Sequence, residues 1–432
     1  MGANHPASAA APRRVRTILI AALAPLFVAT VVVALMLWPD RRPTVDDAEP
    51  VPRYHGTVTR VVTEPCPELP DTPEGPAAAS GPCGTATVAL SDGPDAGAPV
   101  DTPIPAGPGA PTVAVGDEVI VVPLTDPGNP EVSSYNIADQ QRGQPMLWLV
   151  ALFAAAIVAF GRWRGLAAVA GLAASFAVLL WFILPAILDG QPPLLVAVSG
   201  AALIMFVVLY LTHGVTAQTS VAVLGTLASL VLTGILGTLA IAGTHLTGFG
   251  SEDATTLSFI AGDVDLHGLL LAGIIIGSLG VLDDVTVTQA ATVGELARAN
   301  PSLSRLQLYR AATRVGRAHI ASTVNTIVLA YAGASLPVLL LVISGGRGVT
   351  EVLTSEFMAQ EIVRSAVATL GLIAAVPITT GLAAIVTAES RRPARRRTPT
   401  QRTDRADVLA ALGDGSGADR AAPVAGAWEP ER

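Results

Sequence analysis

The chain contains 432 residues, of which 51% are hydrophobic and 14% are charged, and its formal net charge is −8. About a quarter of the residues in an ordinary soluble domain are charged, so this composition excludes that class. Several apolar runs also exceed the roughly 18 residues that cross a bilayer as a helix. We therefore expect an α-helical polytopic membrane protein embedded in the lipid bilayer.

The N-terminal segment predicts a membrane anchor. Residues 1–16 are polar and include Arg13, Arg14 and Arg16, and residues 17–38 are apolar. A cleaved signal peptide has an apolar core of about 7–15 residues that ends in a small-x-small site. This run is longer and ends in Leu-Met-Leu-Trp-Pro-Asp. We expect a cytoplasmic N-terminus over 1–16 and an uncleaved transmembrane anchor over 17–38.

Residues 39–144 predict a small β-rich domain outside the cytoplasm. This segment is rich in Pro, Gly, Asp and Thr, and its Val115-Gly116-Asp117-Glu118 sequence is typical of a turn that leads into a strand. We interpret 65–82 and 91–111 as long loops and expect a barrel-like arrangement of strands. Three short alternating runs predict the strands: Tyr54–Val62, Gly84–Leu90 and Thr112–Val122.

Cys66 and Cys83 are the only two cysteines, and both fall in this segment. Disulfides persist in oxidising compartments. If the β-rich domain lies outside the cytoplasm, we therefore expect the two cysteines to form one disulfide. The alternative is two unpaired thiols in loops.

Residues 145–388 predict a core of seven membrane-spanning helices, which makes eight with the anchor. Arginine-rich short loops lie in the cytoplasm, and here they alternate with loops that carry more acidic than basic residues. This alternation places both termini in the cytoplasm and the protein in the cell (plasma) membrane. Residues 389–432 are polar and aperiodic, and predict a disordered cytoplasmic tail. The seven spans are Met146–Phe160, Leu166–Leu184, Leu194–Leu211, Ser220–Ala242, Leu269–Gln289, Ile320–Ile343 and Val363–Val386.

The sixth and seventh spans carry polar residues at the same end. Ionisable groups inside a membrane segment are costly, so they indicate a functional site. Oxygen ligands and an imidazole suit a proton or a hard cation. We predict a transport or ion-binding site here, with no catalytic residues, no resident metal and no cofactor. The candidates are Asp283, Asp284, Thr286, Thr288 and Gln289 on the sixth span, and His319, Ser322, Thr323, Asn325 and Thr326 on the seventh.

A structural interpretation of the same residues stays open. Asp283 points about 100° away from Asp284 on a helix, so the two carboxylates do not face each other. An Asp at a hydrated helix end would pair with Arg314 or Arg317, and Ser and Thr on a helix face often serve helix packing. The nearby small-residue ridge, Gly273, Gly277 and Gly280, favours close helix packing.

Three segments resemble one bacterial family. They are Gly280-Val-Leu-Asp-Asp-Val-Thr-Val-Thr-Gln289, His319-Ile-Ala-Ser-Thr-Val-Asn-Thr and Leu329-Ala-Tyr-Ala-Gly-Ala-Ser-Leu336. They are similar to the YibE/F-like family of multi-spanning membrane proteins, and the resemblance covers residues 50–388, including the β-rich domain. It implies a seven-span core after an outer domain. It implies no substrate and no catalytic residues, because the family is uncharacterised.

Three functions compete. A secondary transporter or ion-coupled permease fits carboxylates in a span with no nucleotide-binding loop. The alternative is a non-transporting envelope protein whose β-rich domain binds a partner. An intramembrane hydrolase fits less well, because no second span carries a facing carboxylate and no His-Glu-x-x-His or Gly-x-Ser-x-Gly motif is present. We expect a protein that is not an enzyme, whose partners are a proton or cation and a second membrane subunit or copy, and not nucleic acid.

Overall fold

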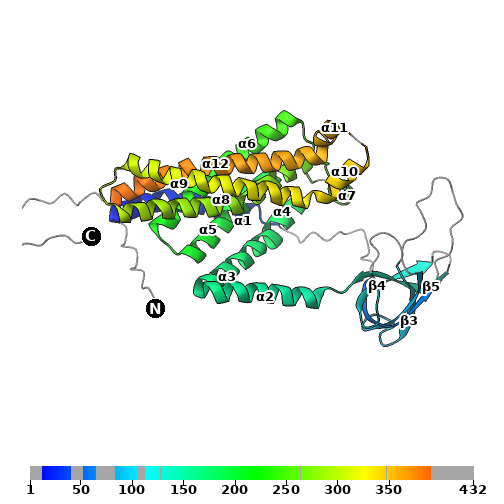
Figure 1. The fold of residues 1–432 in the computed structure, drawn as a ribbon. Helices are drawn as coiled ribbons and strands as arrows, with labels where there is room; N and C mark the ends of the chain where they lie inside the picture. Colours follow the sequence, from blue (N-terminus) through cyan, green and yellow to red (C-terminus); the bar gives the residue numbers. More distant parts are fainter. Residues whose placement is uncertain are drawn as a thin grey trace, which may run out of the picture.

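The protein has two parts, a bundle of long helices and a five-stranded sheet that lies beyond one end of the bundle (Figure 1). The computed structural model describes residues 12–39, 52–64, 83–105, 112–126, 129–262, 264–346 and 348–390. Within these residues, the first long helix begins and the last one ends at the end of the bundle opposite the sheet (Figure 1).

The sheet is antiparallel throughout, with the strand order β3-β2-β1-β4-β5. Its two outer strands approach each other, so the sheet curls into a barrel-like shape (Figure 1). Alternate residues point inward, and Val58, Val88, Val119 and Ile137 form a core of their own with Tyr135. The strands are β1 Tyr54–Glu64, β2 Cys83–Leu90, β3 Pro99–Pro103, β4 Glu118–Asp126 and β5 Asn129–Gln140.

Strand β3 corrects the prediction of a long loop over 91–111. Pro99 and Pro103 suggested a loop, because proline has no N–H for a sheet ladder. In the strand order β3 pairs with β2 alone, and proline is tolerated on such an edge strand. The burial of Thr102 inside the sheet explains why the segment is ordered as a strand.

The start of β4 also differs from the prediction. The alternating run was expected to be a strand from Thr112, but β4 begins at Glu118. The predicted turn at 115–118 is the reason, since the backbone N–H of Ala114 donates to Asp117 Oδ2 across it at 2.8 Å. Cys83 begins β2, whereas Cys66 lies outside the described residues, so the pairing of these two cysteines stays a prediction.

Seven helices of the described chain are long and apolar enough to cross a membrane. They correspond to seven of the eight predicted spans. The third is continuous from Trp163 to Leu188 and contains one π-helical turn. Their bounds are α1 Arg13–Met36, α2 Gly143–Gly161, α3 Trp163–Val178 with η1 Leu179–Ile183 and α4 Leu184–Leu188, α5 Pro193–His213, α6 Ala217–Thr244, α8 Leu266–Ala299 and α12 Glu356–Ser390.

The remaining predicted span, Ile320–Ile343, is not one apolar helix. It is divided at Ser335 between α9 (Arg305–Ala334) and α10 (Leu336–Ser344). Pro337 explains the break, because it has no backbone N–H with which to continue α9. The first half of α9 also carries several arginines, which lower its hydropathy below that of the other seven helices. Nevertheless, α9 packs along α8 and α12 (Figure 1).

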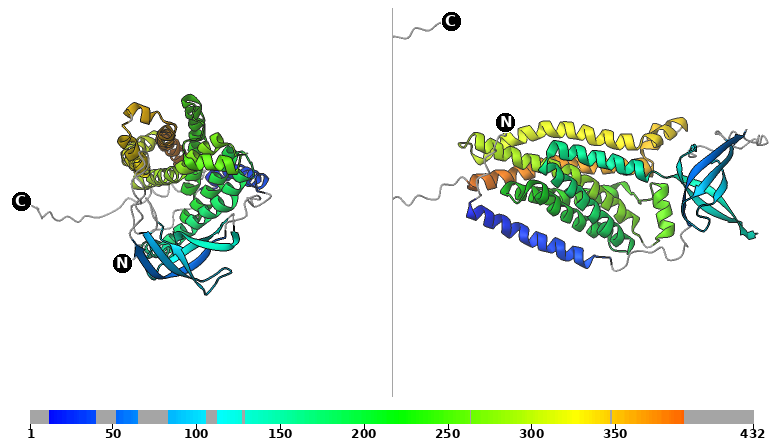
Figure 2. Two further views of the ribbon diagram at one scale, coloured as in Figure 1. Left: turned by 90° about the vertical axis from the view of Figure 1, so that its right-hand side faces the viewer. Right: turned by 90° about the horizontal axis from the view of Figure 1, so that it is seen from below.

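Helix α8 lies at the centre of the bundle, in contact with α5, α6, α9 and α12. In contrast, α2 has no buried residue and packs mainly on α3, and α1 lies along the outside of the bundle (Figure 2). The short helices α7 (Glu252–Ile260) and α11 (Val349–Leu353) lie at the end that faces the sheet (Figure 1).

The expected close packing at the glycine ridge of α8 is wrong for two of its three members. A Cβ atom at Gly273 or Gly280 would meet no other atom within 4 Å, and one at Gly277 would only touch Tyr331 Oη at 3.4 Å. Gly273 and Gly280 therefore face away from the neighbouring helices, whereas Gly277 faces Tyr331 of α9 at an ordinary contact distance. The helices that α8 packs against closely lie on its other faces.

Candidate functional site

Asp283 and Asp284 are neighbours in the second half of α8, but their surroundings differ. The Asp284 side chain is 67% exposed. Asp283 is half-buried, and its Oδ1 atom is buried without a hydrogen-bond partner in the described part of the chain. This difference follows from the rotation of about 100° between successive helix residues. One carboxylate is open to its surroundings and the other is enclosed.

His319 of α9 lies against Asp284 of α8. Its Nε2 atom is 3.8 Å from Asp284 Oδ2, which is within reach of an ion pair but too long for a hydrogen bond. The same nitrogen is buried and makes no hydrogen bond to a described residue. A proton on Nε2 would therefore lie nearest to the Asp284 carboxylate among the described acceptors.

The alternative pairing of Asp283 with an arginine is not found. Arg314 and Arg317 are exposed on α9, and among the described residues Asp283 forms no ion pair with either of them. The carboxylate of Asp283 is thus held in the bundle without a compensating cation from the described chain.

Thr286 and Gln289 connect α8 to its neighbours. Both are buried, with exposed fractions of 0% and 2%. The Thr286 hydroxyl lies 2.6 Å from the hydroxyl of Thr226 on α6. The Thr380 hydroxyl on α12 donates to Gln289 Oε1 at 2.9 Å. These two residues are therefore in place to hold three helices together next to Asp283.

The hydroxyls of the other predicted threonines bond to carbonyl groups of their own helix. Thr288 donates to the carbonyl of Asp284 at 2.8 Å, Thr323 to that of His319 at 3.0 Å, and Thr326 to that of Ser322 at 3.3 Å. The predicted residues are thus not one cluster around a shared space. Ser322, Asn325 and Thr326 are exposed on the outer face of α9.

Sequence reasoning missed most of a buried polar seam between α6, α8 and α12. The residues on α6 follow an i, i+3, i+7 pattern, which is one helix face and a signal that the sequence does contain. The two on α12 follow Pro377, and Thr379 Oγ1 is buried without a hydrogen-bond partner in the described chain. We define the polar seam as Thr226, Ser229, Thr233, Thr286, Gln289, Thr379 and Thr380.

The ionisable side chains of the site are two carboxylates and one imidazole. No group of three or more His, Cys, Asp or Glu residues that could hold a metal occurs among the residues that the structure describes. In this site the imidazole of His319 lies close to the exposed carboxylate of Asp284. The preceding residue, Asp283, carries a second carboxylate that is partly enclosed. Side chains of these kinds act as proton donors and acceptors in proteins.

These features indicate the general class to which the protein belongs. Long apolar helices, with ionisable groups in one of them and a buried polar seam beside it, make this a helical membrane protein. The family model described as YibE/F-like protein matches residues 149–389. The match covers more than half of the chain, so the chain belongs to the YibE/F-like family. No curated protein and no solved structure matches it.

The extent of the family match is shorter than the resemblance predicted. It begins at residue 149, inside α2, and ends at the close of α12. The sheet and α1 lie outside it, although the resemblance was expected to cover residues 50–388. The polar residues of α8 and α9 all lie inside the matched part.

Proposed function

We propose that this YibE/F-like protein is a secondary transporter or ion-coupled permease that uses a proton or cation at Asp283, Asp284 and His319. The single observation that carries the proposal is the Oδ1 atom of Asp283, which is buried within an apolar helix and has no hydrogen-bond partner among the described residues. Such a group is expensive in a membrane and is by default a functional residue. A protein that only anchors another domain in the membrane would not need such a buried carboxylate.

The geometry favours a proton over a larger ion. A buried carboxylate without a partner costs much less free energy when it is protonated than when it is charged. Asp284 is exposed and lies near His319, so this pair can exchange protons with the surroundings. We infer that protons reach Asp283 through Asp284 and His319, and that the charge state of Asp283 differs between the two ends of the transport cycle.

We further propose a plasma-membrane location with both termini in the cytoplasm and the sheet outside. Arginines gather at the start of α1, where α2 meets α3, at the end of α8 and in the first half of α9, which lie towards the end of the bundle opposite the sheet (Figure 1). Short loops rich in arginine stay in the cytoplasm. The arginines concerned are Arg13, Arg14, Arg16, Arg162, Arg164, Arg298, Arg305, Arg310, Arg314 and Arg317.

A second membrane subunit or a second copy of the chain is part of the proposal. Ser322, Asn325 and Thr326 are exposed on α9, and polar side chains at membrane depth usually face another helix. The alternative function, an envelope protein whose sheet binds a partner, is favoured by the separate hydrophobic core of the sheet. We do not propose an enzyme, because the two carboxylates lie side by side on one helix and do not face each other.

The test is proton-coupled flux in proteoliposomes. The variants are Asp283→Asn, Asp284→Asn and His319→Gln, and Glu295→Gln is the matched control. Glu295 is also on α8, but its exposed side chain pairs with Arg298 in the helix end. We expect the first two variants to abolish flux driven by a pH gradient, His319→Gln to slow it, and the control to retain it.

The outcomes separate the alternatives. If Asp283→Asn and Asp284→Asn move protons and solutes at the wild-type rate, the site assignment is wrong. If the wild-type protein moves nothing across a broad panel of ions and solutes, the envelope function is favoured. If Asp283→Asn does not accumulate as a folded protein, the carboxylate has a structural role.

A further inference from the structure

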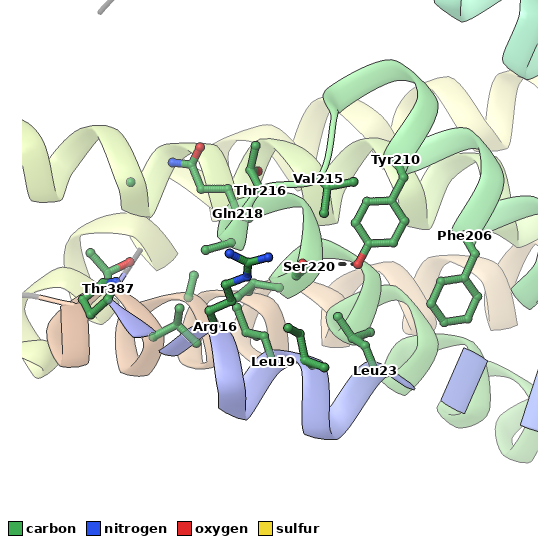
Figure 3. A pocket seen from close by; sticks show the side chains of 18 of the residues that line it. Arg16, Leu19, Leu23, Phe206, Tyr210, Val215, Thr216, Gln218, Ser220 and Thr387 are labelled. Atoms are coloured by element: carbon green, nitrogen blue, oxygen red, sulfur yellow. Dashed lines mark hydrogen bonds between the residues drawn. The ribbon is translucent and has the colours of Figure 1, made fainter. Parts of the chain in front are cut away.

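A cavity of about 1190 Å³ lies between α1 and the bundle, at the end of the molecule opposite the sheet (Figure 3). Residues of α1, α5, α6, α8 and α12 line it. Pockets for drug-sized ligands have volumes of about 300–1000 Å³, so this cavity has room for a large molecule. It does not involve Asp283, Asp284 or His319, and α1 lies outside the part of the chain that matches the family.

The lining of the cavity is cationic. The guanidinium group of Arg16 points into the space between α1 and α6 (Figure 3), and it forms no ion pair with a described residue. Arg298 is the second cation in the lining, and it pairs with Glu295, which is not a lining residue. The lining contains no aspartate or glutamate. An anion is therefore the ligand that this charge distribution favours.

Polar groups that can bond to an anionic headgroup line the same cavity as Arg16. Gln218 is in the cavity wall with its amide directed away from the guanidinium, and Tyr210 Oη and Ser220 Oγ lie 3.2 Å apart (Figure 3). Amide and hydroxyl groups of this kind donate hydrogen bonds to phosphate and ester oxygens. The polar part of the cavity thus offers one free guanidinium together with neutral donors.

The rest of the cavity is apolar and continues along α1. Leu19, Leu23 and Phe27 follow Arg16 at helical spacing, and the Phe27 ring meets the Phe206 ring of α5 edge-on at 5.2 Å. From Arg16 to Phe27 the helix rises about 16 Å. The cavity therefore has a cationic end at the arginine-rich end of the bundle and an apolar wall that runs towards the middle of the helices.

We propose that this cavity binds an anionic phospholipid, with its phosphate on Arg16 and an acyl chain along the apolar wall of α1. The pairing of a guanidinium with a phosphate gives charge-assisted hydrogen bonds, and basic pockets between membrane helices bind anionic headgroups. A small soluble anion would leave the apolar wall unused. A lipid uses both parts and connects α1 to the core.

The experiment measures lipid retention by native mass spectrometry on the purified full chain. The probes are phosphatidylglycerol and phosphatidylcholine with identical acyl chains. We expect the wild type to retain phosphatidylglycerol in excess, and Arg16→Gln to weaken its binding about tenfold, as expected for the loss of a hydrogen bond to a charged group. Arg14→Gln is the matched control, because Arg14 lies in the same turn of α1 but does not line the cavity.

A second variant tests the apolar part without touching the charge. Ala24 is an exposed residue of α1 that lines the cavity, so Ala24→Trp fills space without disturbing the core. We expect this variant to retain less of both lipids. Its unfolding midpoint without added lipid should equal that of the wild type.

Three results would overturn the proposal. The first is an Arg16→Gln variant that retains the same excess of phosphatidylglycerol as the wild type. The second is an Arg14→Gln variant that loses as much as Arg16→Gln, which would indicate general attraction between arginines and lipid. The third is displacement of the lipid by inorganic phosphate or glycerol 3-phosphate, which would assign the cavity to a soluble anion.

Discussion

The contact between α9 and the polar seam makes a sharp prediction for Gly316→Ala. Gly316 is buried where α9 meets α8 and α12. A Cβ atom there would lie 2.5 Å from Gln289 Nε2 and 2.7 Å from Val376 Cγ1. Both distances are shorter than a carbon atom tolerates, so either both neighbours must move or α9 must shift away from them. Moving Gln289 would strain its bond with the Thr380 hydroxyl.

The size of the effect follows from two opposing contributions. An added methyl group in a well-packed core costs about 1–3 kcal/mol. Replacing glycine by alanine inside a helix stabilises the folded protein by about 0.5–1 kcal/mol. We therefore expect Gly316→Ala to lower the free energy of unfolding by about 1 kcal/mol, within the range of about 0–2.5 kcal/mol that these two contributions leave. Unfolding in mixed detergent micelles, followed by circular dichroism, measures this difference.

A matched control separates the contact from the general effect of alanine. A Cβ atom at Gly280 on α8 would meet no atom within 4 Å, so Gly280→Ala should be neutral or slightly stabilising. Adding Gly316→Ala to a Gln289→Ala variant should lower the free energy of unfolding by less than Gly316→Ala does in the wild type, because the clash with Gln289 is then absent. If Gly316→Ala is as stable as Gly280→Ala, α9 does not pack against the polar seam as described.

Three further predictions concern other contacts. A double-mutant cycle with Thr226→Val and Thr286→Val should give a coupling of about 0.6 kcal/mol and no more than about 1.7, the range measured for hydrogen bonds between membrane helices; zero coupling in detergent unfolding would contradict the 2.6 Å contact. In the sheet, the hydrogen bond to Asp95 raises the pKa of Tyr135 to about 12, so the neutral phenol stabilises the fold below pH about 10 and this stabilisation is lost as the pH rises to about 12. In a phenolate absorbance titration, we expect the wild type to show an ionisation step at about pH 12 that is missing in Tyr135→Phe. An ordinary pKa for Tyr135 would refute this prediction. An impermeant thiol reagent should label the two cysteines in intact cells after mild reduction, and labelling only after lysis would invert the proposed topology.

The sequence predicted the location of ionisable groups well, because a carboxylate stands out in an apolar run. Asp283 and Asp284 were placed within α8 on that ground, and their different orientations follow from helix geometry alone. The spatial partners were not predictable in the same way. Thr226 and Thr380 lie far from α8 in sequence, and the periodicity of a helix gives its faces but not which neighbour each face meets.

The errors in the fold have local physical causes. Proline is decisive in one place and tolerated in another: Pro337 ends α9 within a predicted span, whereas Pro99 and Pro103 lie within an edge strand that was expected to be a loop. The outward-facing glycines of α8 show the same limit, because a small residue indicates close packing only when another helix lies opposite. These outcomes depend on tertiary neighbours, and a single sequence does not reveal them.

The length of α8 has a consequence for any charge that reaches its carboxylates. At 34 residues the helix is about 51 Å long, about 20 Å more than the hydrocarbon core of a bilayer. Asp283 lies about 26 Å from its first residue, so when the start of α8 lies at the boundary of the hydrocarbon, Asp283 lies near the opposite boundary. Most of the membrane potential then falls between the sheet side and the carboxylates. A proton arriving from the sheet side crosses nearly the whole field, worth about 2.3 kcal/mol per 100 mV, while one leaving towards the arginine-rich end crosses almost none. Voltage should therefore act mainly on one half of the proposed transport cycle.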